Sequence, residues 1–263
     1  MNRLTETELM KLLPGVCAIA LKAGEKIMEI YATDFDVAVK DDASPVTEAD
    51  TAAEAIIAPA LASLEPGIPI VAEEAASAGK VPDVGDGPFW LVDPLDGTKE
   101  FLNRNGEFTV NIALIQDREP VLGVVYAPAL DTLYAGAKGA GATRKSGDRP
   151  AVDIAVRPEP AAGLTIVASR RHGDPAVLEK FLSGRSVAET RNAGSSLKFC
   201  LLAAGEADLY PRFGRTMEWD TAAGHAVLLA AGGVVTTEDG APLTYAKNAI
   251  FENPHFIGWG GVR

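Results

Sequence analysis

The chain has 263 residues, of which 47% are hydrophobic and 23% charged, enough for one large or two small domains with a real apolar core. The net charge of -12 and the pI near 4.8 argue against a protein that coats nucleic acid or an anionic membrane. A small anionic substrate needs only a local basic pocket or a metal ion, so such substrates stay open. The composition is that of a soluble globular protein.

The cysteines and the amino terminus bear on the cellular compartment. Cys17 and Cys200 lie far apart in sequence and form neither a disulfide framework nor a zinc-binding spacing. The first residues are polar and acidic, without the basic start and apolar core of a secretory signal. No apolar stretch is long and uncharged enough to cross a bilayer. We therefore expect a cytoplasmic protein. Weak peripheral association with the inner membrane is left open, although the sequence shows no anchor.

A first helix is predicted after Thr5, where cap-like residues precede apolar side chains that recur at helical spacing as far as Tyr31. A short alternating piece at 37–40 follows. The segment that starts at Ser44 then opens a second helix, which runs to about Leu64.

Thr47 is the predicted N-cap of that second helix. Asp50 stands at the third helical position, an arrangement that resembles a capping box. Local capping would account for Asp50 without any catalytic role, so this stretch alone leaves both interpretations open.

Two adjacent acids, Glu73 and Glu74, follow an apolar strand predicted at 68–72. Neighbouring residues of a strand point to opposite faces, so both can face one site only if the strand has ended. The next segment, 75–87, is rich in Ala, Gly and Pro and is predicted to be a loop.

The central stretch of the chain is 89–101, where two carboxylates and a hydroxyl follow an apolar run. Residues 89–92 are predicted to form a buried strand, which the following Pro and Gly require to stop and turn. Asp93 and Asp96 therefore lie at its carboxyl end. Pro94 fixes one backbone dihedral and Gly97 permits a turn closed to other residues, so the two acids can converge.

Converging carboxylates repel each other unless a proton or a cation lies between them, and Mg²⁺ commonly binds one or two carboxylates together with phosphate oxygens. Thr98 could then cap a short helix whose N–H groups face an anion. The alternative is an ordinary surface turn, because Asp, Pro and Gly are common turn residues.

Three β-rich runs after this stretch predict an antiparallel meander, at 108–116, 121–126 and 132–136. The glycine-rich segment 136–149 is predicted to be an exposed hairpin or loop. From about residue 164 strands and helices alternate, which is typical of an α/β lobe with a partly parallel sheet. The predicted strands are 164–168, 187–190, 207–210 and 233–237, and the predicted helices are 175–182, 196–204 and 221–231.

The sequence therefore predicts two lobes, an α+β lobe at 1–157 and an α/β lobe at 158–263, with a hinge near 157–163. Active sites favour such junctions. Asp220 begins a helix of small residues in the second lobe, where it could point into the junction or act only as an N-terminal cap.

Three segments taken together resemble one known family. Asp93-Pro-Leu-Asp96-Gly-Thr98, Trp219-Asp220-Thr-Ala-Ala-Gly224 and Glu73-Glu74, in this order and spacing, resemble the inositol monophosphatase superfamily of metal-dependent, lithium-sensitive phosphatases. The resemblance covers nearly the whole chain. It implies a two-lobed, layered αβαβα fold, with an antiparallel sheet in the first lobe and a mixed sheet in the second.

Within the superfamily, three further segments look like the 3'(2'),5'-bisphosphate nucleotidase branch. They are 96–101, 194–200 and 209–214. This branch implies removal of the 3'(2')-phosphate of adenosine 3'(2'),5'-bisphosphate to give AMP, and a place in sulfur assimilation. Two or three Mg²⁺ per site and inhibition by Li⁺ are implied as well.

The resemblance also implies residue roles. Metal ligands are the carboxylates of Glu73, Asp93, Asp96 and Asp220 and the main-chain carbonyl of Leu95. Asp50 and Thr98 position and deprotonate the attacking water, with Glu74 as outer support. The implied substrate-binding residues are Glu73, Leu95, Asp96, Gly97, Thr98, Lys198, Arg212 and Asp220.

Discrimination between substrates is expected at the mouth of the site. Lys198, Arg212 and one of Arg170 and Arg171 are candidates for a second phosphate, because guanidinium binds phosphate as a fork. Phe213 or Tyr210 could stack on adenine. Each has a plainer alternative: Lys198 as a solvated helix residue and Tyr210 as a strand core residue. Inositol phosphatases tend to carry an acid where this chain has Phe213.

Two rival functions stay open. One is an inositol or histidinol phosphatase with the same metal ligands, and the other is a metal- or ligand-binding regulator without turnover. Expected partners are limited to a small phosphorylated substrate, with no nucleic acid polymer and no integral membrane segment. The oligomeric state is left open between a monomer and a homodimer.

Overall fold

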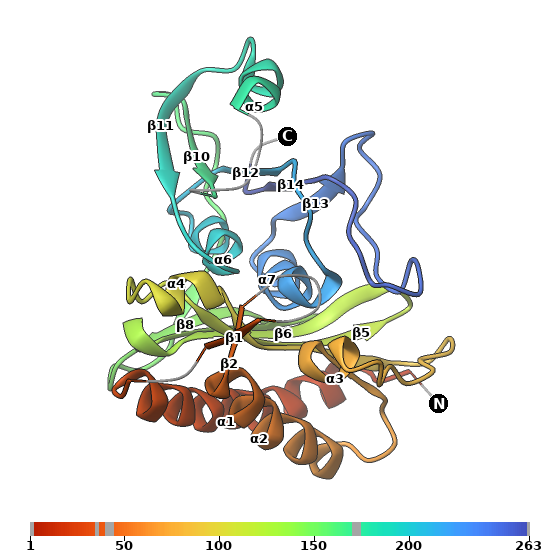
Figure 1. Ribbon diagram of the computed structural model, residues 1–263. Helices are drawn as coiled ribbons and strands as arrows, with labels where there is room; N and C mark the ends of the chain where they lie inside the picture. Colours follow the sequence, from red (N-terminus) through yellow and green to blue (C-terminus); the bar gives the residue numbers. More distant parts are fainter. Residues whose placement is uncertain (1–2, 35–36, 40–44, 170–174, 262–263) are drawn as a thin grey trace.

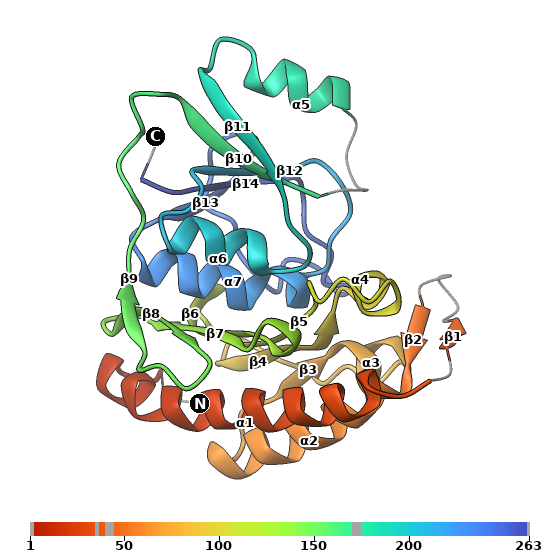
Figure 2. The ribbon, with the colours of Figure 1, turned by 90° about the vertical axis from the view of Figure 1, so that its left-hand side faces the viewer.

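The computed structural model describes residues 3–34, 37–39, 45–169 and 175–261. Five layers follow one another (Figures 1 and 2): a helix pair, a seven-stranded sheet, a second helix pair, a five-stranded sheet and a single outer helix. This is the layered αβαβα arrangement predicted from the sequence.

Helices α1 (Glu6–Tyr31) and α2 (Glu48–Leu64) form the first layer. Thr5 caps α1 in a reciprocal box with Glu8, and Thr47 caps α2 in the same way with Asp50. Both capping predictions are confirmed. Strands β1 (Val37–Val39) and β2 (Pro45–Thr47) pair antiparallel, whereas the predicted ends at Lys40 and Ser44 lie outside the described residues.

The seven-stranded sheet has its strands in sequence order, and all neighbours are antiparallel except β3 and β4. Its strands are β3 (Ile70–Ala72), β4 (Phe89–Asp96), β5 (Thr109–Gln116), β6 (Glu119–Ala127), β7 (Thr132–Ala137), β8 (Gly141–Ser146) and β9 (Val152–Ile154). The meander is confirmed, and the segment 136–149 is the β7–β8 hairpin. Short helices α3 (Glu73–Ser77), α4 (Thr98–Leu102) and η1 (Pro128–Leu130) connect the strands. The segment 75–87 is therefore a loop only after Ser77, because α3 occupies its start.

The five-stranded sheet is mixed, with the order β11-β10-β12-β14-β13. Its strands are β10 (Leu164–Ala168), β11 (Val187–Asn192), β12 (Leu209–Arg212), β13 (Val234–Thr237) and β14 (Phe256–Trp259). Strand β10 runs parallel to β11 and β12, and β14 runs antiparallel to β12 and β13. The helices are α5 (Pro175–Leu182), α6 (Leu197–Ala203) and α7 (Glu218–Ala230). The alternating rhythm is confirmed, while β9 and β14 were not predicted.

One apolar core joins the two halves of the chain. Leu91 and Val125 of the seven-stranded sheet belong to the same buried cluster as Phe199 of α6 and Val227 of α7. The opposite face of that sheet packs against α1 and α2 in a separate cluster. The boundary at residue 157 stays a prediction, and the shared core makes α6 and α7 a common layer between the sheets.

Close contact between α7 and β6 depends on Gly123. A Cβ atom at this position would lie 2.3 Å from the carbonyl oxygen of Ala223. A helix backbone cannot move away as a flexible side chain can, so only glycine fits. Gly258 of β14 is a matched contrast, because a Cβ there would meet its nearest atom at 3.4 Å.

We predict that Gly123→Ala lowers the free energy of unfolding by about 1–3 kcal/mol, the usual cost of overpacking a core. Gly258→Ala should be neutral or stabilise by about 0.4–1 kcal/mol, through the entropy of the unfolded chain. Urea denaturation of both variants measures the difference. Equal stability of the two variants would show that the close approach of α7 to β6 at Gly123 does not require glycine.

Candidate active site

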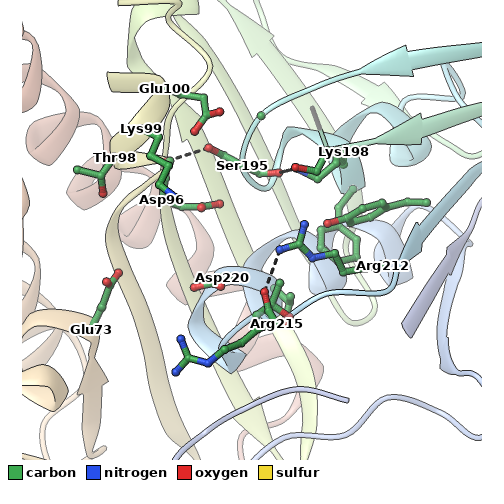
Figure 3. A pocket seen from close by; sticks show the side chains of 17 residues that line it. Glu73, Asp96, Thr98, Lys99, Glu100, Ser195, Lys198, Arg212, Arg215 and Asp220 are labelled. Atoms are coloured by element: carbon green, nitrogen blue, oxygen red, sulfur yellow. Dashed lines mark hydrogen bonds between the residues drawn. The ribbon is translucent and has the colours of Figure 1, made fainter. Parts of the chain in front are cut away.

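A cavity of about 250 Å³ lies where the carboxyl end of β4 approaches the start of α7 and the loop before α6. Figure 3 shows the carboxylates of Glu73, Asp96 and Asp220 on one side of it, with the cationic groups of Lys198 and Arg212 on the other. Residues that are more than 140 positions apart in the chain thus line one space. Acidic and basic walls face each other across it.

Strand β4 positions Asp93 and Asp96. The predicted end of the strand at Val92 is wrong, because β4 continues to Asp96 with an irregular register between the two acids. A β-bulge tolerates proline, and Pro94 falls within this one. One oxygen of Asp93 accepts the N–H of Leu95 at 3.0 Å, and Asp96 accepts from Asn111 of β5 at 3.3 Å. The bulge lets both acids approach the same region.

Glu73 and Glu74 are the first residues of α3, so the strand has ended before them and the alternation of a strand no longer applies. The carboxylate of Glu54 in α2 accepts the N–H of Glu74 at 2.9 Å and that of Ala75 at 3.0 Å. Glu54 thereby fixes the start of α3. Glu73 lines the cavity, while Glu74 is not among the lining residues.

Asp220 satisfies both of its sequence interpretations. Its carboxylate accepts the N–H of Met217 at 2.8 Å, which caps α7, and the residue also lines the cavity. The hydroxyl of Ser196 donates to the carbonyl oxygen of Asp220 at 2.7 Å. The first turn of α7 is thus attached to the start of α6.

Burial and mutual repulsion perturb these acids. Burial raises the pKa of Asp93 well above its usual value, and Glu73, Asp96 and Asp220 raise it further. The pKa of Asp220 is also raised well above its usual value, by burial first and then by Asp96 and Glu73. Burial raises the pKa of Asp96 to about 6, against the opposing effects of Lys198 and the Asn111 hydrogen bond. The four carboxylates therefore interact electrostatically.

Such a set has the chemistry of a divalent cation site. Carboxylate and carbonyl oxygens are the ligands that Mg²⁺ and Ca²⁺ prefer, and a cation would relieve the repulsion that raises these pKa values. Across the described ranges, no group of three Asp, Glu, His or Cys side chains is already assembled to hold a metal ion. These oxygen donors fit a divalent cation by their chemistry and by the electrostatic interactions among them.

Asp50 and Thr98 lie together beside this wall. One oxygen of Asp50 accepts the N–H of Thr47 at 2.8 Å and its hydroxyl at 2.7 Å, and the other lies 3.5 Å from the hydroxyl of Thr98. The N-cap of α4 is Gly97, in the left-handed conformation with φ of 92°, so the prediction that Thr98 caps this helix is wrong. Capping and contact with Thr98 use different oxygens of Asp50.

Lys198 is buried, at 5% exposure, which excludes its interpretation as a solvated residue. Its ammonium donates to the carbonyl oxygens of Ala193 at 3.2 Å and Ser195 at 2.6 Å. Burial lowers the pKa of Lys198 to about 8, while Asp96 acts in the opposite direction. A buried cation therefore lies next to the acidic wall.

Arg212 forms the rest of the basic wall. Its side chain is buried, and Nη2 donates to the carbonyl oxygen of Arg215 at 2.9 Å. Its Nε is buried and has no hydrogen-bond partner among the described residues. Buried N–H groups are rarely left unpaired, and a bound anion would satisfy this one. Arg170 and Arg171 lie outside the described residues.

The two aromatic candidates differ in position. Tyr210 is buried and lines the cavity, so its core and site interpretations hold together. Phe213 packs edge-on against Phe181, with ring centroids 5.4 Å apart, and is not among the lining residues. Of the two, only Tyr210 is placed to contact a ligand in this cavity.

Ser195, Asn111, Glu54 and Arg215 were not predicted individually. The Ser195 hydroxyl lies 2.8 Å from the carbonyl oxygens of Asp96 and Glu107, and so ties the loop before α6 to the end of β4. A Cβ at Gly97 would lie 2.2 Å from this hydroxyl. The segment 194–200 was singled out in the sequence, but nothing in it showed that Ser195 is the residue that donates to a carbonyl oxygen of β4.

Comparison with known proteins identifies the class. A family model described as the inositol monophosphatase family matches residues 8–257. The chain belongs to this family.

Named relatives agree. The "3'(2'),5'-bisphosphate nucleotidase CysQ" of Escherichia coli strain K12 is 47% identical over 93% of this chain and 98% of its own length. The protein of that name from Buchnera aphidicola is 44% identical over 91% of this chain and 89% of its own length. The crystal structure of CysQ from Bacteroides thetaiotaomicron, a bacterial member of the inositol monophosphatase family, superposes with a TM-score of 0.80 at 38% identity and covers 100% of both chains. An inositol monophosphatase from Anabaena has a TM-score of 0.75 at 29% identity, over 96% of this chain and 92% of its own.

The raised pKa of Asp96 gives a prediction with a readout other than activity. Without a cation, folding raises this pKa from 3.8 to about 6, so the stability that Asp96 contributes at low pH is lost as the pH rises between these values. Asp96→Asn should therefore stabilise the cation-free protein relative to wild type at about pH 8 and not at about pH 4.

Mg²⁺ should raise the melting temperature of the wild type more at about pH 8 than at about pH 5, because protons compete with the cation. The gain should shrink in Asp96→Asn. Thermal denaturation with and without Mg²⁺ measures both effects, and an equal gain in the two proteins would exclude Asp96 as a ligand.

Proposed function

We propose that this protein is a Mg²⁺-dependent phosphatase that removes the 3'(2')-phosphate of adenosine 3'(2'),5'-bisphosphate to give AMP and phosphate. The observation that carries the proposal is the cavity in which three carboxylates, each interacting with the buried Asp93, face Lys198 and Arg212. A substrate with two phosphates matches both walls, one phosphate at the cation site and one at the basic side chains. The name of relatives 47% identical to the chain supports the same substrate.

Glu73, Asp93, Asp96 and Asp220 are the proposed carboxylate ligands, with the carbonyl of Leu95 as a further ligand. When bound, Mg²⁺ would offset the charge of the phosphate and lower the pKa of a coordinated water. Two or three ions per site are proposed, since the acids are more numerous than one Mg²⁺ commonly uses. Burial of Asp93, at 1% exposure, supports the assignment, because buried charges are usually paired or bind metals.

Asp50 and Thr98 are proposed to activate the attacking water. Two donors from Thr47 hold one oxygen of Asp50, so the other oxygen is directed to the hydroxyl of Thr98. That hydroxyl can donate to Asp50 and accept from water through its lone pairs. As water attacks phosphorus in line, its proton passes to Thr98 and that of Thr98 to Asp50, while the bond from phosphorus to the ribose oxygen breaks and this oxygen takes a proton from solvent water. Glu74 is the proposed outer support.

The backbone N–H groups of Gly97 and Thr98 are the proposed donors to the reacting phosphate. At the opposite wall Lys198 and Arg212 are the proposed partners of the second phosphate, because guanidinium and ammonium donate charge-assisted hydrogen bonds. The unpaired Nε of Arg212 supports this assignment. Tyr210 is the proposed contact for the nucleotide base.

An inositol or histidinol phosphatase would share every acid and differ only at the basic wall. The buried Lys198 and Arg212 favour the bisphosphate. A regulator without turnover has no need of the Asp50–Thr98 contact.

No helix in the described residues is long and apolar enough to cross a membrane. The cytoplasm stays our proposed location, supported by free Cys17 and Cys200.

Phosphate release with Mg²⁺ from adenosine 3',5'-bisphosphate and from inositol 1-phosphate tests the function directly. We expect strong preference for the nucleotide, with AMP as the product. Preference for inositol 1-phosphate would be compatible with the acids as cation ligands, but it would refute the assignment of Lys198 and Arg212 to a second phosphate.

The second-phosphate assignment predicts a selective defect. Arg212→Gln should lower kcat/KM for adenosine 3',5'-bisphosphate by roughly 10- to 100-fold, the loss of one charged hydrogen bond. It should change kcat/KM for adenosine 3'-monophosphate, which lacks the second phosphate, by much less. Arg191→Gln is the matched control, because this arginine is exposed, pairs with Glu189 at 2.8 Å and does not line the cavity. An equal loss for both substrates would show that Arg212 acts only structurally.

We also propose that Li⁺ inhibits by replacing one Mg²⁺, which the family match motivates. Submillimolar to millimolar Li⁺ should slow phosphate release most at limiting Mg²⁺, since the two cations compete for the same oxygens. Titration of Li⁺ at several Mg²⁺ concentrations measures this. Insensitivity to Li⁺ at limiting Mg²⁺ would contradict shared sites.

A further inference from the structure

A second cavity, which we call the α7–β13 cavity, has a volume of about 590 Å³. It lies between α7, edge strand β13, the turn at 240–243 and the start of β6. None of its lining residues lines the catalytic cavity. Its volume falls within the roughly 300–1,000 Å³ of small-molecule sites. The proposed phosphatase reaction makes no use of it.

The wall of this cavity is mainly apolar. Its apolar and aromatic side chains are Pro120, Leu229, Val234, Val235, Pro242, Leu243 and Trp259. Leu229 is 38% exposed, which places it at the rim, whereas Val235 and Leu243 are buried. A ligand would gain most of its binding free energy by removing such surface from water.

His225 is the buried polar group in this wall, with 3% of its surface exposed. Its Nδ1 lies 2.9 Å from the hydroxyl of Tyr245, which in turn lies 3.3 Å from the hydroxyl of Thr221. Its Nε2 has no hydrogen-bond partner among the described residues. Because His225 lines the cavity, this nitrogen is a polar atom that a ligand there can reach, whereas the hydroxyl of Thr236 already accepts from Trp259 at 3.0 Å.

The charge of His225 limits the ligand. Burial lowers its pKa to about 3, and nearby Lys247 lowers it further. The imidazole is therefore neutral at neutral pH. The charged lining residue is Glu119, which is exposed and lies 4.0 Å from Lys138, so an ionic ligand group in the apolar part of the cavity would lose hydration without gaining an opposite charge. The ring nitrogen can be a donor or an acceptor depending on the tautomer, and a hydroxyl group can meet either state.

We propose that the α7–β13 cavity binds an uncharged, mainly apolar ring molecule that carries a hydroxyl group, with this hydroxyl on Nε2 of His225. The apolar rings lie against α7 and β13. Carboxylates and phosphates of similar shape are excluded by the lack of a cation on the wall.

Calorimetric titration of 2-naphthol tests the proposal, with 2-naphthoate as the anionic match. We expect 2-naphthol to bind the wild type at least about tenfold more tightly than 2-naphthoate, because the carboxylate of bound 2-naphthoate would be a buried charge without a partner. Saturating Mg²⁺ and inorganic phosphate should leave the affinity unchanged, because they occupy the catalytic cavity.

Leu229→Trp fills the rim at a partly exposed position and should weaken 2-naphthol binding at least about tenfold with the fold retained. Leu130→Trp is its control, because Leu130 is 49% exposed and lines neither cavity. His225→Leu removes the polar anchor and should weaken binding by about tenfold. No saturable binding of 2-naphthol, displacement by phosphate, or unchanged binding in Leu229→Trp would each overturn the proposal.

Discussion

Three carboxylates line the catalytic cavity and a fourth, Asp93, interacts with all of them, so the surrounding fold has to hold the four acids against their own repulsion. Asp93, Asp96 and Asp220 are each held by a separate donor, from Leu95, Asn111 and Met217. These anchors are independent of one another, so each of the three acids has its own fixed position. Burial, and after it repulsion among the acids, raises the pKa values of Asp93, Asp96 and Asp220, and a bound cation would relieve the repulsion.

Much of the fold follows from local patterns in the sequence. The reciprocal Thr47 and Asp50 cap and the helical spacing of α1 are properties of neighbouring residues, and both are readable without the structure. The course of β4 is not, because Pro94 signals an end to a strand and only pairing with β5 shows that a bulge accommodates it. Strands β9 and β14 were not predicted, although the equally short β3, β12 and β13 were, and their places are set by pairing with β8, β12 and β13.

Some features of the candidate site can likewise be predicted from the sequence and others cannot. Its acids lie in the last half of β4 or in the first turns of α3 and α7, positions that sequence order reveals approximately. Contacts between distant segments do not have such a signal. Ser195 reaches the carbonyl of Asp96 across 99 positions of the chain. Burial of Lys198 and the packing of Phe213 on Phe181 depend on how α6 and α5 cover the second sheet, which is a property of tertiary structure alone.

The core shared between the two sheets also has a consequence for synthesis of the protein. The last strand of the seven-stranded sheet ends at Ile154, whereas α7, which covers one face of that sheet, ends at Ala230. At roughly 5–20 residues per second, a ribosome needs several seconds to make the intervening chain. During this interval the apolar face around Leu91 and Val125 is without its cover, and the nascent chain depends on chaperones or on rapid elongation to avoid aggregation. The same helix carries Asp220, so no partly made chain holds the complete set of acids.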